Sequence, residues 1–403
     1  MQSWRERNRG RSHASVSLRA RRTSAHVDYA LMRVALDMRQ SGAFGVGTYT
    51  RNVVHALAGI DHDDHFLLIG APDRLRELGA LPENFLRVPF AHEPSSPRYF
   101  LEFHRIIRRA QCDAVHVPNM FWRPLLVNCP YVMTVHDLLM FFGHASRTGK
   151  LQRWFSRRAL RGAARILAVS KFTRNELIRL HGIPPDRIDV AYNAIDDRLA
   201  HGHATDADRQ MIAERYQVNY PFLLYAGNIQ PHKNITRIIE AFSALKGELQ
   251  KENQYPDLKL IIIGDELSKH PDLRRTVVRS GMQNDVRFLG FVPIEVLRIF
   301  YDGAKIFVFP SLYEGFGLPP LEAMAHGTPV VTSNLSSLPE VVGQAAVMVN
   351  PENVFDIMRA LHRVLLDQPL RERMKQRGYR QVERFSWTAS ATQILNVYRD
   401  IAG

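Results

Sequence analysis

Short runs of apolar residues recur along the chain, separated by segments whose apolar residues follow helical spacing. Such runs, bounded by turn residues, predict buried strands, and their alternation with helices predicts parallel sheets. The runs form two series, and each series predicts a doubly wound α/β sheet. The first series comprises residues 34–37, 65–70, 114–118, 131–137 and 164–170, and the second comprises 221–228, 258–266, 286–292, 306–311, 329–334 and 345–350.

The two series predict two Rossmann-like domains, residues 32–200 and 201–385, which face each other across a cleft that holds the ligand. A chain of 403 residues exceeds what one hydrophobic core supports, which agrees with two domains. The polar, weakly patterned stretch 196–210 is the predicted linker. A last helical segment, 386–403, is a candidate for docking on the first domain.

Residues 1–31 carry seven arginines against two acidic residues and show no apolar periodicity. We predict that this basic leader is disordered, and that it is either a dispensable extension or a misassigned start. It lacks the apolar segment of a secretory signal, and no apolar run in the chain approaches the roughly 18 residues that span a bilayer. The two cysteines, Cys112 and Cys129, argue against a disulfide framework and favour a reducing compartment.

The net charge of +13 is concentrated in two places, the leader and the segment 98–165, which has twelve basic residues against three acidic ones. Within this segment, residues 98–109 and 150–167 alternate arginines with aromatic side chains, as does a helix that lies on an anionic membrane surface. The aromatic residues are Phe100, Phe103, Trp154 and Phe155. A solvated helix face would explain the same pattern. No zinc spacing, RNP-like run or heptad accompanies the charge, so we expect no nucleic-acid partner.

The stretch 307–331 reads as a strand, a turn, a helix and a second strand, and it contains Glu314 and Glu322. A helix that starts near Pro319 places Glu322 in its first turn and leaves four amides before it without helical partners. These amides belong to Gly315, Phe316, Gly317 and Leu318, and they suit a phosphate group. Each carboxylate alone has an ordinary structural explanation, but two of them beside such a loop predict binding of neutral hydroxyls next to a phosphate.

The sequence "EGFGLPPLEAMAHGTPVV" resembles the signature of the retaining, GT-B-fold glycosyltransferases of family 4, also called glycosyl transferases group 1, and is similar to their bacterial mannosyltransferase-like members. The resemblance extends from Met32 to the end of the chain. It includes the segments "GVGTYTRNVVHAL", "TVHDL", "AVSKFTRNEL", "YNAID", "GNIQPHKN", "FLGFV" and "FSWTASATQIL".

In the second domain, the resemblance implies that Glu322 binds the ribose hydroxyls of a nucleotide-sugar donor and that Glu314 contacts the donor sugar. It places the amides of residues 315–318 on the sugar and diphosphate, and Lys233 on the diphosphate. A cation and amides at this position would stabilise the charge that develops on the leaving diphosphate. Many relatives have an arginine where this chain has Asn228, so the phosphate contacts differ here. The nucleobase is expected near Phe291 and Val292.

In the first domain, the glycine-rich turn before the predicted helix 48–58 lacks the GxGxxG spacing and alone would be read as a tight turn. The resemblance implies that Gly45 and Gly47 approach the donor diphosphate and sugar. His136, at the end of a predicted strand, would be structural on its own and contacts the transferred sugar according to the resemblance. The predicted catalytic residues are therefore His136, Lys233 and Glu314.

The resemblance implies a retaining, metal-independent hexosyltransferase without a cofactor, which we expect to move mannose from GDP-mannose to a lipid-linked or polysaccharide acceptor. The resemblance implies front-face substitution, and no nucleophile is evident beyond the donor-binding glutamates. The acidic stretch 61–65 is interpreted as a polar loop rather than a metal site. The predicted location is the cytoplasmic face of a bacterial plasma membrane, in surface polysaccharide or lipopolysaccharide synthesis. The alternatives are a nucleotide-sugar epimerase or phosphorylase of the same fold, or a non-catalytic nucleotide-sugar-binding scaffold.

Overall fold

The computed structural model describes residues 31–40, 45–92, 96, 98–120, 127–142, 147–200 and 202–403. Residues Met32–Gly403 form one compact unit. Most of the predicted basic leader and residues 41–44 of the glycine-rich turn lie outside the described residues.

The chain contains two parallel sheets, one in each half, as the apolar runs predict. The seven-stranded sheet has the order β3-β2-β1-β4-β5-β6-β7, and the six-stranded sheet has the order β10-β9-β8-β11-β12-β13. Their strands are β1 Arg33–Asp37, β2 His65–Gly70, β3 Phe85–Pro89, β4 Ala114–Val117, β5 Tyr131–Val135, β6 Arg165–Ala168, β7 Ile188–Val190, β8 Phe222–Ala226, β9 Lys259–Ile263, β10 Val286–Gly290, β11 Ile306–Phe309, β12 Val330–Ser333 and β13 Val347–Val349.

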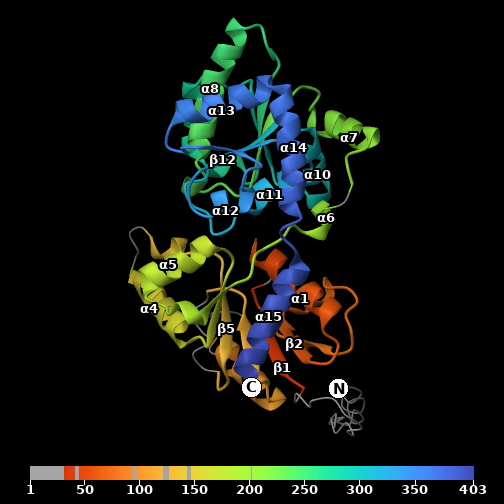
Figure 1. Ribbon diagram of the computed structural model, residues 1–403, viewed down its shortest axis with the longest axis vertical. Coiled ribbons are helices and arrows are strands. Elements are labelled where there is room, and N and C mark those ends of the chain that lie inside the picture. Colours follow the sequence, from red (N-terminus) through yellow and green to blue (C-terminus); the bar gives the residue numbers. More distant parts are fainter. Residues whose placement is uncertain are drawn as a thin grey trace, which may run out of the picture. The chain divides into compact units, whose positions relative to one another are not determined.

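Helices connect the strands and cover both faces of each sheet (Figure 1). They are α1 Val46–Ile60, α2 Pro72–Arg76, α3 Arg98–Ala110, α4 Arg147–Gly162, α5 Lys171–His181, α6 Asp197–Ala200, α7 Asp206–Tyr216, α8 Ile235–Lys251, α9 Pro271–Arg279, α10 Ile294–Gly303, α11 Leu318–Ala325, α12 Leu338–Val342, α13 Val354–Leu366, α14 Gln368–Val382 and α15 Trp387–Ala402. In both sheets the strand order reverses beside the first strand of the series, between β1 and β4 and between β8 and β11. Loops at such reversals are where doubly wound folds bind ligands.

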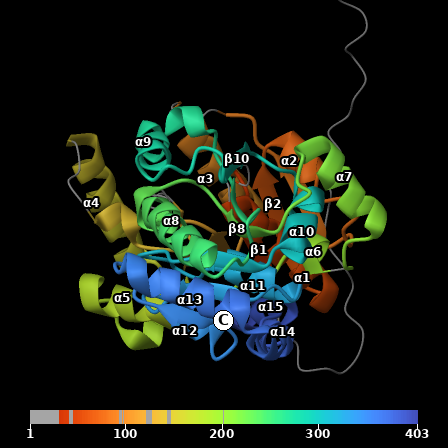
Figure 2. The same cartoon turned by 90° about the horizontal axis from the view of Figure 1, so that it is seen from above.

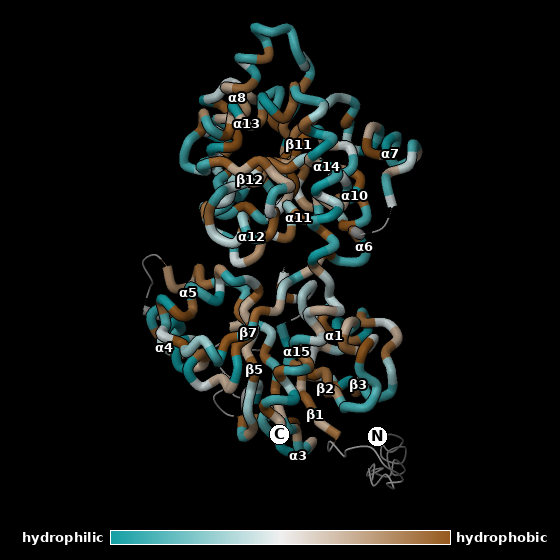
Figure 3. The backbone as a smooth tube through the Cα atoms, viewed as in Figure 1, coloured by the Kyte–Doolittle hydropathy of each residue, from teal (hydrophilic) through white to brown (hydrophobic). Residues whose placement is uncertain are grey.

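Each sheet is buried on both faces, which explains why its central strands are continuous apolar runs. Hydrophobic residues are concentrated at strands such as β2 and β11 (Figure 3). In the second half, α8 and α13 lie side by side against one face of the sheet (Figure 2). Fully burying an aliphatic side chain of these strands contributes roughly 1.5–3 kcal/mol, so the two cores dominate the stability of the fold.

The last helix, α15, packs against α1 and the first sheet rather than against the second sheet that precedes it in sequence (Figure 1). Its apolar face, including Ile394 and Val397, joins the buried cluster beneath α1. The indole N–H of Trp387, at the start of α15, donates to the carbonyl of Ile195 at 2.9 Å. The polar stretch 196–210, predicted as a linker, lies between β7 and β8 and contains α6 and the first residues of α7.

Candidate active site

The loop between β11 and α11 is held from several sides by hydroxyl groups that donate to its carbonyls. Ser337 donates to the carbonyls of Glu314 at 3.0 Å and Phe316 at 2.6 Å. The hydroxyls of Ser170 and Thr173, from the start of α5, donate to the carbonyl of Gly315 at 2.7 and 3.1 Å. Three consecutive carbonyls of the loop, those of residues 314–316, are therefore hydrogen-bonded within the protein.

The amides of this loop remain available. Within the described residues, the N–H groups of 315–318 donate to no acceptor. Gly317 precedes α11 with φ of 106°, and Pro319 lies in the first turn as predicted. A Cβ atom on Gly315 would lie 1.6 Å from the carbonyl oxygen of His136, so only glycine fits there. The sequence-predicted amides and His136 are thus neighbours, brought together from different sheets.

Lys233 and Glu314 form a buried ion pair. The Lys233 Nζ atom lies 2.7 Å from Oε1 and 2.9 Å from Oε2 of Glu314, and the two side chains are only 12% and 11% exposed. Lys233 ends a 3-10 turn, Pro231–Lys233, that follows β8, and its Nζ also lies 5.3 Å from the ring centre of Phe309. The sequence predicted separate roles for the two residues and did not predict that they bind each other.

Glu322 lies in the second turn of α11, because the helix begins at Leu318; the predicted position in the first turn is wrong. Its Oε2 atom accepts a hydrogen bond of 2.8 Å from the hydroxyl of Tyr301. Burial raises the pKa of Glu322 to about 7, the hydrogen bond from Tyr301 opposes this, and the charge of Asp196 adds to it. Near neutral pH this carboxyl group is therefore poised between its two protonation states.

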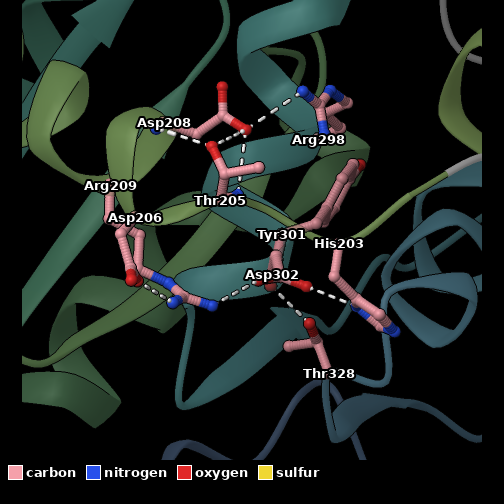
Figure 4. A network of polar contacts seen from close by, with 9 residues as sticks. All are labelled: His203, Thr205, Asp206, Asp208, Arg209, Arg298, Tyr301, Asp302 and Thr328. Carbon is pink, nitrogen blue, oxygen red and sulfur yellow. Dashed lines mark hydrogen bonds and ion pairs between the residues drawn. The ribbon is translucent and has the colours of Figure 1, made fainter.

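Tyr301, which sequence reasoning missed, is fixed by its own surroundings (Figure 4). Its ring is fully buried, and its carbonyl accepts a hydrogen bond from Thr328. The next residue, Asp302, accepts from His203 at 2.7 Å and from Arg209 at 3.5 Å, which ties α10 to the segment around α7. Tyr301 precedes Glu322 by 21 positions, so no local pattern relates them.

His136 directly follows β5, as predicted, and its ring is oriented by the protein. Its Nε2 atom lies 2.8 Å from the carbonyl oxygen of Pro118. A carbonyl only accepts hydrogen bonds, so Nε2 carries the hydrogen and Nδ1 of the neutral ring is an acceptor. Burial lowers the pKa of His136, which favours this neutral form. The ring of Tyr49 lies edge-on at 4.8 Å between centres.

The two first-domain glycines have different roles. Gly45, with φ of 85°, precedes α1, and its carbonyl accepts the N–H of Tyr49 at 2.9 Å. Gly47 is buried inside α1, which begins at Val46 rather than at the predicted Thr48. Gly45 therefore belongs to the turn and Gly47 to the helix.

The remaining predicted donor residues follow strands of the second sheet. Asn228, beyond β8, is exposed, and its carbonyl accepts the Tyr225 hydroxyl at 2.9 Å. Phe291, beyond β10, is 76% exposed, whereas Val292 is buried in the second core. A ligand would therefore meet the side chain of Phe291 but only the backbone of Val292.

Metal-ligating clusters are absent from the described part of the chain: no group of three or more His, Cys, Asp or Glu side chains is placed to hold a metal ion. The acidic stretch 61–65 is a loop running into β2. The Asp61 carboxylate accepts hydrogen bonds from the amides of Asp63 and Asp64. The Arg399 guanidinium of α15 donates to Asp61 at 3.0 Å and to Asp64 at 3.4 Å. These carboxylates hold α15 in place.

Comparison with known proteins agrees with this geometry. The family Glycosyltransferase Family 4 matches residues 44–199, and Glycosyl transferases group 1 matches residues 206–381. The O-antigen chain mannosyltransferase B of Escherichia coli is 36% identical over 288 residues, which cover 70% of this chain and 73% of the relative. The serotype-specific mannosyltransferase WbdA of E. coli is 34% identical over 231 residues, 56% of this chain and only 27% of that longer protein.

Among solved structures, Anabaena HepE in complex with UDP-glucose superposes with a TM-score of 0.73 at 18% identity, covering 91% of this chain and 99% of HepE. At this identity the likeness establishes the GT-B fold alone. Since both halves of the chain match and a relative of 36% identity is covered over most of its length, the chain belongs to glycosyltransferase family 4 and is a glycosyltransferase.

Proposed function

We propose that this enzyme is a retaining hexosyltransferase that moves mannose from GDP-mannose to a lipid-linked or polysaccharide acceptor in bacterial surface glycan synthesis. The observation that carries the proposal is the buried Lys233–Glu314 pair beside the free amides of residues 315–318. Mannose and a surface glycan are supported by the names of the relatives, two O-antigen or serotype-specific mannosyltransferases. Family membership favours transfer over the epimerase, phosphorylase and scaffold alternatives.

In this proposal the donor diphosphate binds the amides of 315–318 and the Nζ of Lys233. The positive end of α11 and the lysine charge are the only groups in the proposed set that suit a dianionic ligand. Glu322 accepts from the ribose hydroxyls, and Tyr301 fixes the direction of its carboxylate. The sugar lies between Glu314 and the Nδ1 atom of His136, which as an acceptor binds a sugar hydroxyl.

The chemical step proposed is front-face substitution. The bond between the sugar C1 and the diphosphate oxygen breaks while the acceptor oxygen approaches the same face, and the departing diphosphate takes the acceptor hydroxyl's proton. Lys233 and the amides stabilise the charge that grows on that diphosphate, and a single preorganised donor of this kind contributes roughly 3–4 kcal/mol to a transition state. His136 is neutral and orients the sugar without transferring a proton. The proposal includes no metal.

We further propose that α3 and α4 rest on the anionic inner face of the plasma membrane. Lys150, Trp154, Arg157, Arg158 and Arg161 share one exposed face of α4. Trp154 is 57% exposed, and its neighbour Leu151 is equally so. An exposed apolar and cationic face of this kind suits a charged lipid surface.

On α3 the structure corrects the prediction for Phe103, one of the aromatic residues expected at the membrane surface. Phe103 is buried, and the Arg39 guanidinium lies 3.7 Å from its ring centre, so Phe103 belongs to the core. The side chain of Phe100 lies outside the described residues. Exposed on α3 are Leu101 with Arg98, Arg105, Arg108 and Arg109. No described helix is long and apolar enough to cross a bilayer.

A donor panel tests the proposed function. Purified enzyme with a bacterial membrane extract is offered GDP-mannose, UDP-glucose, UDP-galactose or UDP-N-acetylglucosamine, and nucleotide release is measured. We expect release from GDP-mannose that depends on the extract and is lost on substitution of Lys233. Preference for a uridine donor would refute the donor assignment, and release that does not depend on the extract would refute the acceptor class.

A further inference from the structure

A chain of buried polar side chains lies beneath α1 and α15, on one face of the first sheet. The hydroxyl of Tyr398, on α15, lies 2.5 Å from Nδ1 of His116, on β4. The Nε2 atom of the same ring lies 2.7 Å from Oγ1 of Thr134, on β5. Thr134 in turn lies 2.9 Å from the hydroxyl of Tyr49, on α1. Three hydrogen bonds thus connect α15 to α1.

All four side chains are buried, and the cluster around them is otherwise apolar. Burial lowers the pKa of His116 to about 3, so its ring is neutral. A neutral imidazole donates through one nitrogen and accepts through the other, so the bond to Tyr398 fixes the direction of the bond to Thr134. Removing one hydroxyl therefore affects every bond of the chain rather than one alone.

This series of hydrogen-bonded side chains ends beside His136, in the candidate active site. Thr134 and His136 are two residues apart at the end of β5, and the Tyr49 ring contacts the His136 ring edge-on at 4.8 Å between centres. The N–H of Tyr49 also donates to the carbonyl of Gly45 in the turn before α1. The Tyr49 side chain therefore contacts His136, the first-domain residue that faces the sugar in the proposed function.

We propose that Tyr398 is a positioning residue for sugar transfer: through His116 and Thr134 it holds the Tyr49 side chain, and Tyr49 holds the His136 ring. Tyr398 touches no substrate and acts through these residues. The proposal rests on the sugar contact assigned to His136 above. It explains why a polar chain is retained in a core where apolar residues would pack without needing partners.

Tyr398→Phe removes the hydroxyl and keeps the ring. Tyr131→Phe is the matched control, because Tyr131 is also buried, lies on β5, and donates its hydroxyl to the carbonyl of Ala159 at 2.6 Å without joining the chain. We expect similar melting temperatures for the two variants. In Tyr398→Phe, kcat falls at least about tenfold, since a misplacement of 1 Å costs roughly 100-fold. GDP binding by calorimetry is unchanged, because the second domain holds the nucleotide, and Tyr131→Phe retains kcat.

Imidazole ¹⁵N spectra give a readout that does not require turnover. The signals of His116 and His136 are assigned by their loss in His116→Asn and His136→Asn. We expect both signals to shift in Tyr398→Phe and neither to shift in Tyr131→Phe. An unchanged His136 signal in Tyr398→Phe, or an equal loss of kcat in both variants, would overturn the proposal. A shifted His136 signal in an enzyme that releases no nucleotide from GDP-mannose would support the positioning role and refute the donor instead.

Discussion

The Lys233–Glu314 pair allows stability and catalysis to be separated. In Lys233→Met the carboxylate of Glu314 stays buried, at 11% exposure, without its cation. Breaking a buried ion pair from one side costs about 3–5 kcal/mol, and we expect the lower end because each side chain keeps some contact with solvent. In the double variant Lys233→Met with Glu314→Gln, no charge is left unpaired, so the loss is expected to be only about 1 kcal/mol.

The turnover of these two variants should not follow their stability. Both the single and the double variant lack the cation that is proposed to face the leaving diphosphate, and loss of such a donor lowers turnover by roughly 100-fold to 1,000-fold. The double variant is therefore expected to be nearly as stable as the wild type and still inactive. Lys251→Met is the matched control, because Lys251 pairs with Glu248 at 2.8 Å on an exposed helix face, where solvent screening leaves an ion pair with little effect on stability.

Urea unfolding followed by tryptophan fluorescence gives the stabilities, and nucleotide release under single-turnover conditions gives the rates. A double variant that is as destabilised as Lys233→Met would show that the single loss is a packing effect rather than an unpaired charge. Wild-type turnover by either Lys233 variant would refute the role of this lysine in leaving-group stabilisation.

Four further predictions concern the donor site and the membrane face. Folding raises the pKa of Glu322 from 4.5 to about 7, so between pH 4.5 and pH 7 the folded state holds a proton that the unfolded state has lost. The free energy of unfolding should therefore fall by up to about 3 kcal/mol as the pH rises from 4.5 to 7. Urea unfolding should show this pH dependence in the wild type and a weaker one in Glu322→Gln. Tyr301→Phe removes the hydrogen bond to Glu322 and should weaken GDP binding by about 1–2 kcal/mol, measured by calorimetry, whereas unchanged binding would place Glu322 away from the ribose. Transfer should persist in EDTA, and loss restored by Mg²⁺ would contradict a metal-independent step. Trp154→Ala should reduce flotation with anionic liposomes, whereas Phe355→Ala, which removes another exposed aromatic residue on α13, should not; equal behaviour would exclude α4 as the contact.

The sequence predicted every strand of the second sheet, and the two first-sheet strands that it missed, β3 and β7, have a common physical reason. β3 and β7 are the edge strands of the first sheet. Each edge strand is partly solvated, so β3 carries the exposed Leu86 and Arg87, and β7 carries Asp189, which binds Arg165 at 2.7 Å. An interrupted apolar run of this kind is indistinguishable from a loop in the sequence.

The candidate site could be predicted from the sequence where its residues are contiguous. Glu314, the four amides and Glu322 lie within nine positions, so a single loop-helix junction carries their chemistry. The groups that orient them come from elsewhere: Tyr301 from α10, and the hydroxyls of Ser170 and Thr173 from the other sheet. Such contacts depend on how whole elements pack, and no spacing in the sequence encodes them. The same holds for Tyr398, which meets His116 across 282 positions.

In the proposed function, the ion pair also determines how the diphosphate is held. A lysine ammonium group has three N–H donors, and in Lys233 two of them face the two oxygens of Glu314, at 2.7 and 2.9 Å. One donor is left for a phosphate oxygen, and its direction is set by the carboxylate that binds the other two. In the proposed function Asn228 adds no positive charge, so this directed N–H and the amides of 315–318 are the second-domain contacts to the diphosphate. On this proposal Glu314 affects leaving-group stabilisation through Lys233 as well as through its contact with the sugar, and Glu314→Gln is expected to lower turnover even for a donor sugar that lacks the hydroxyl it binds.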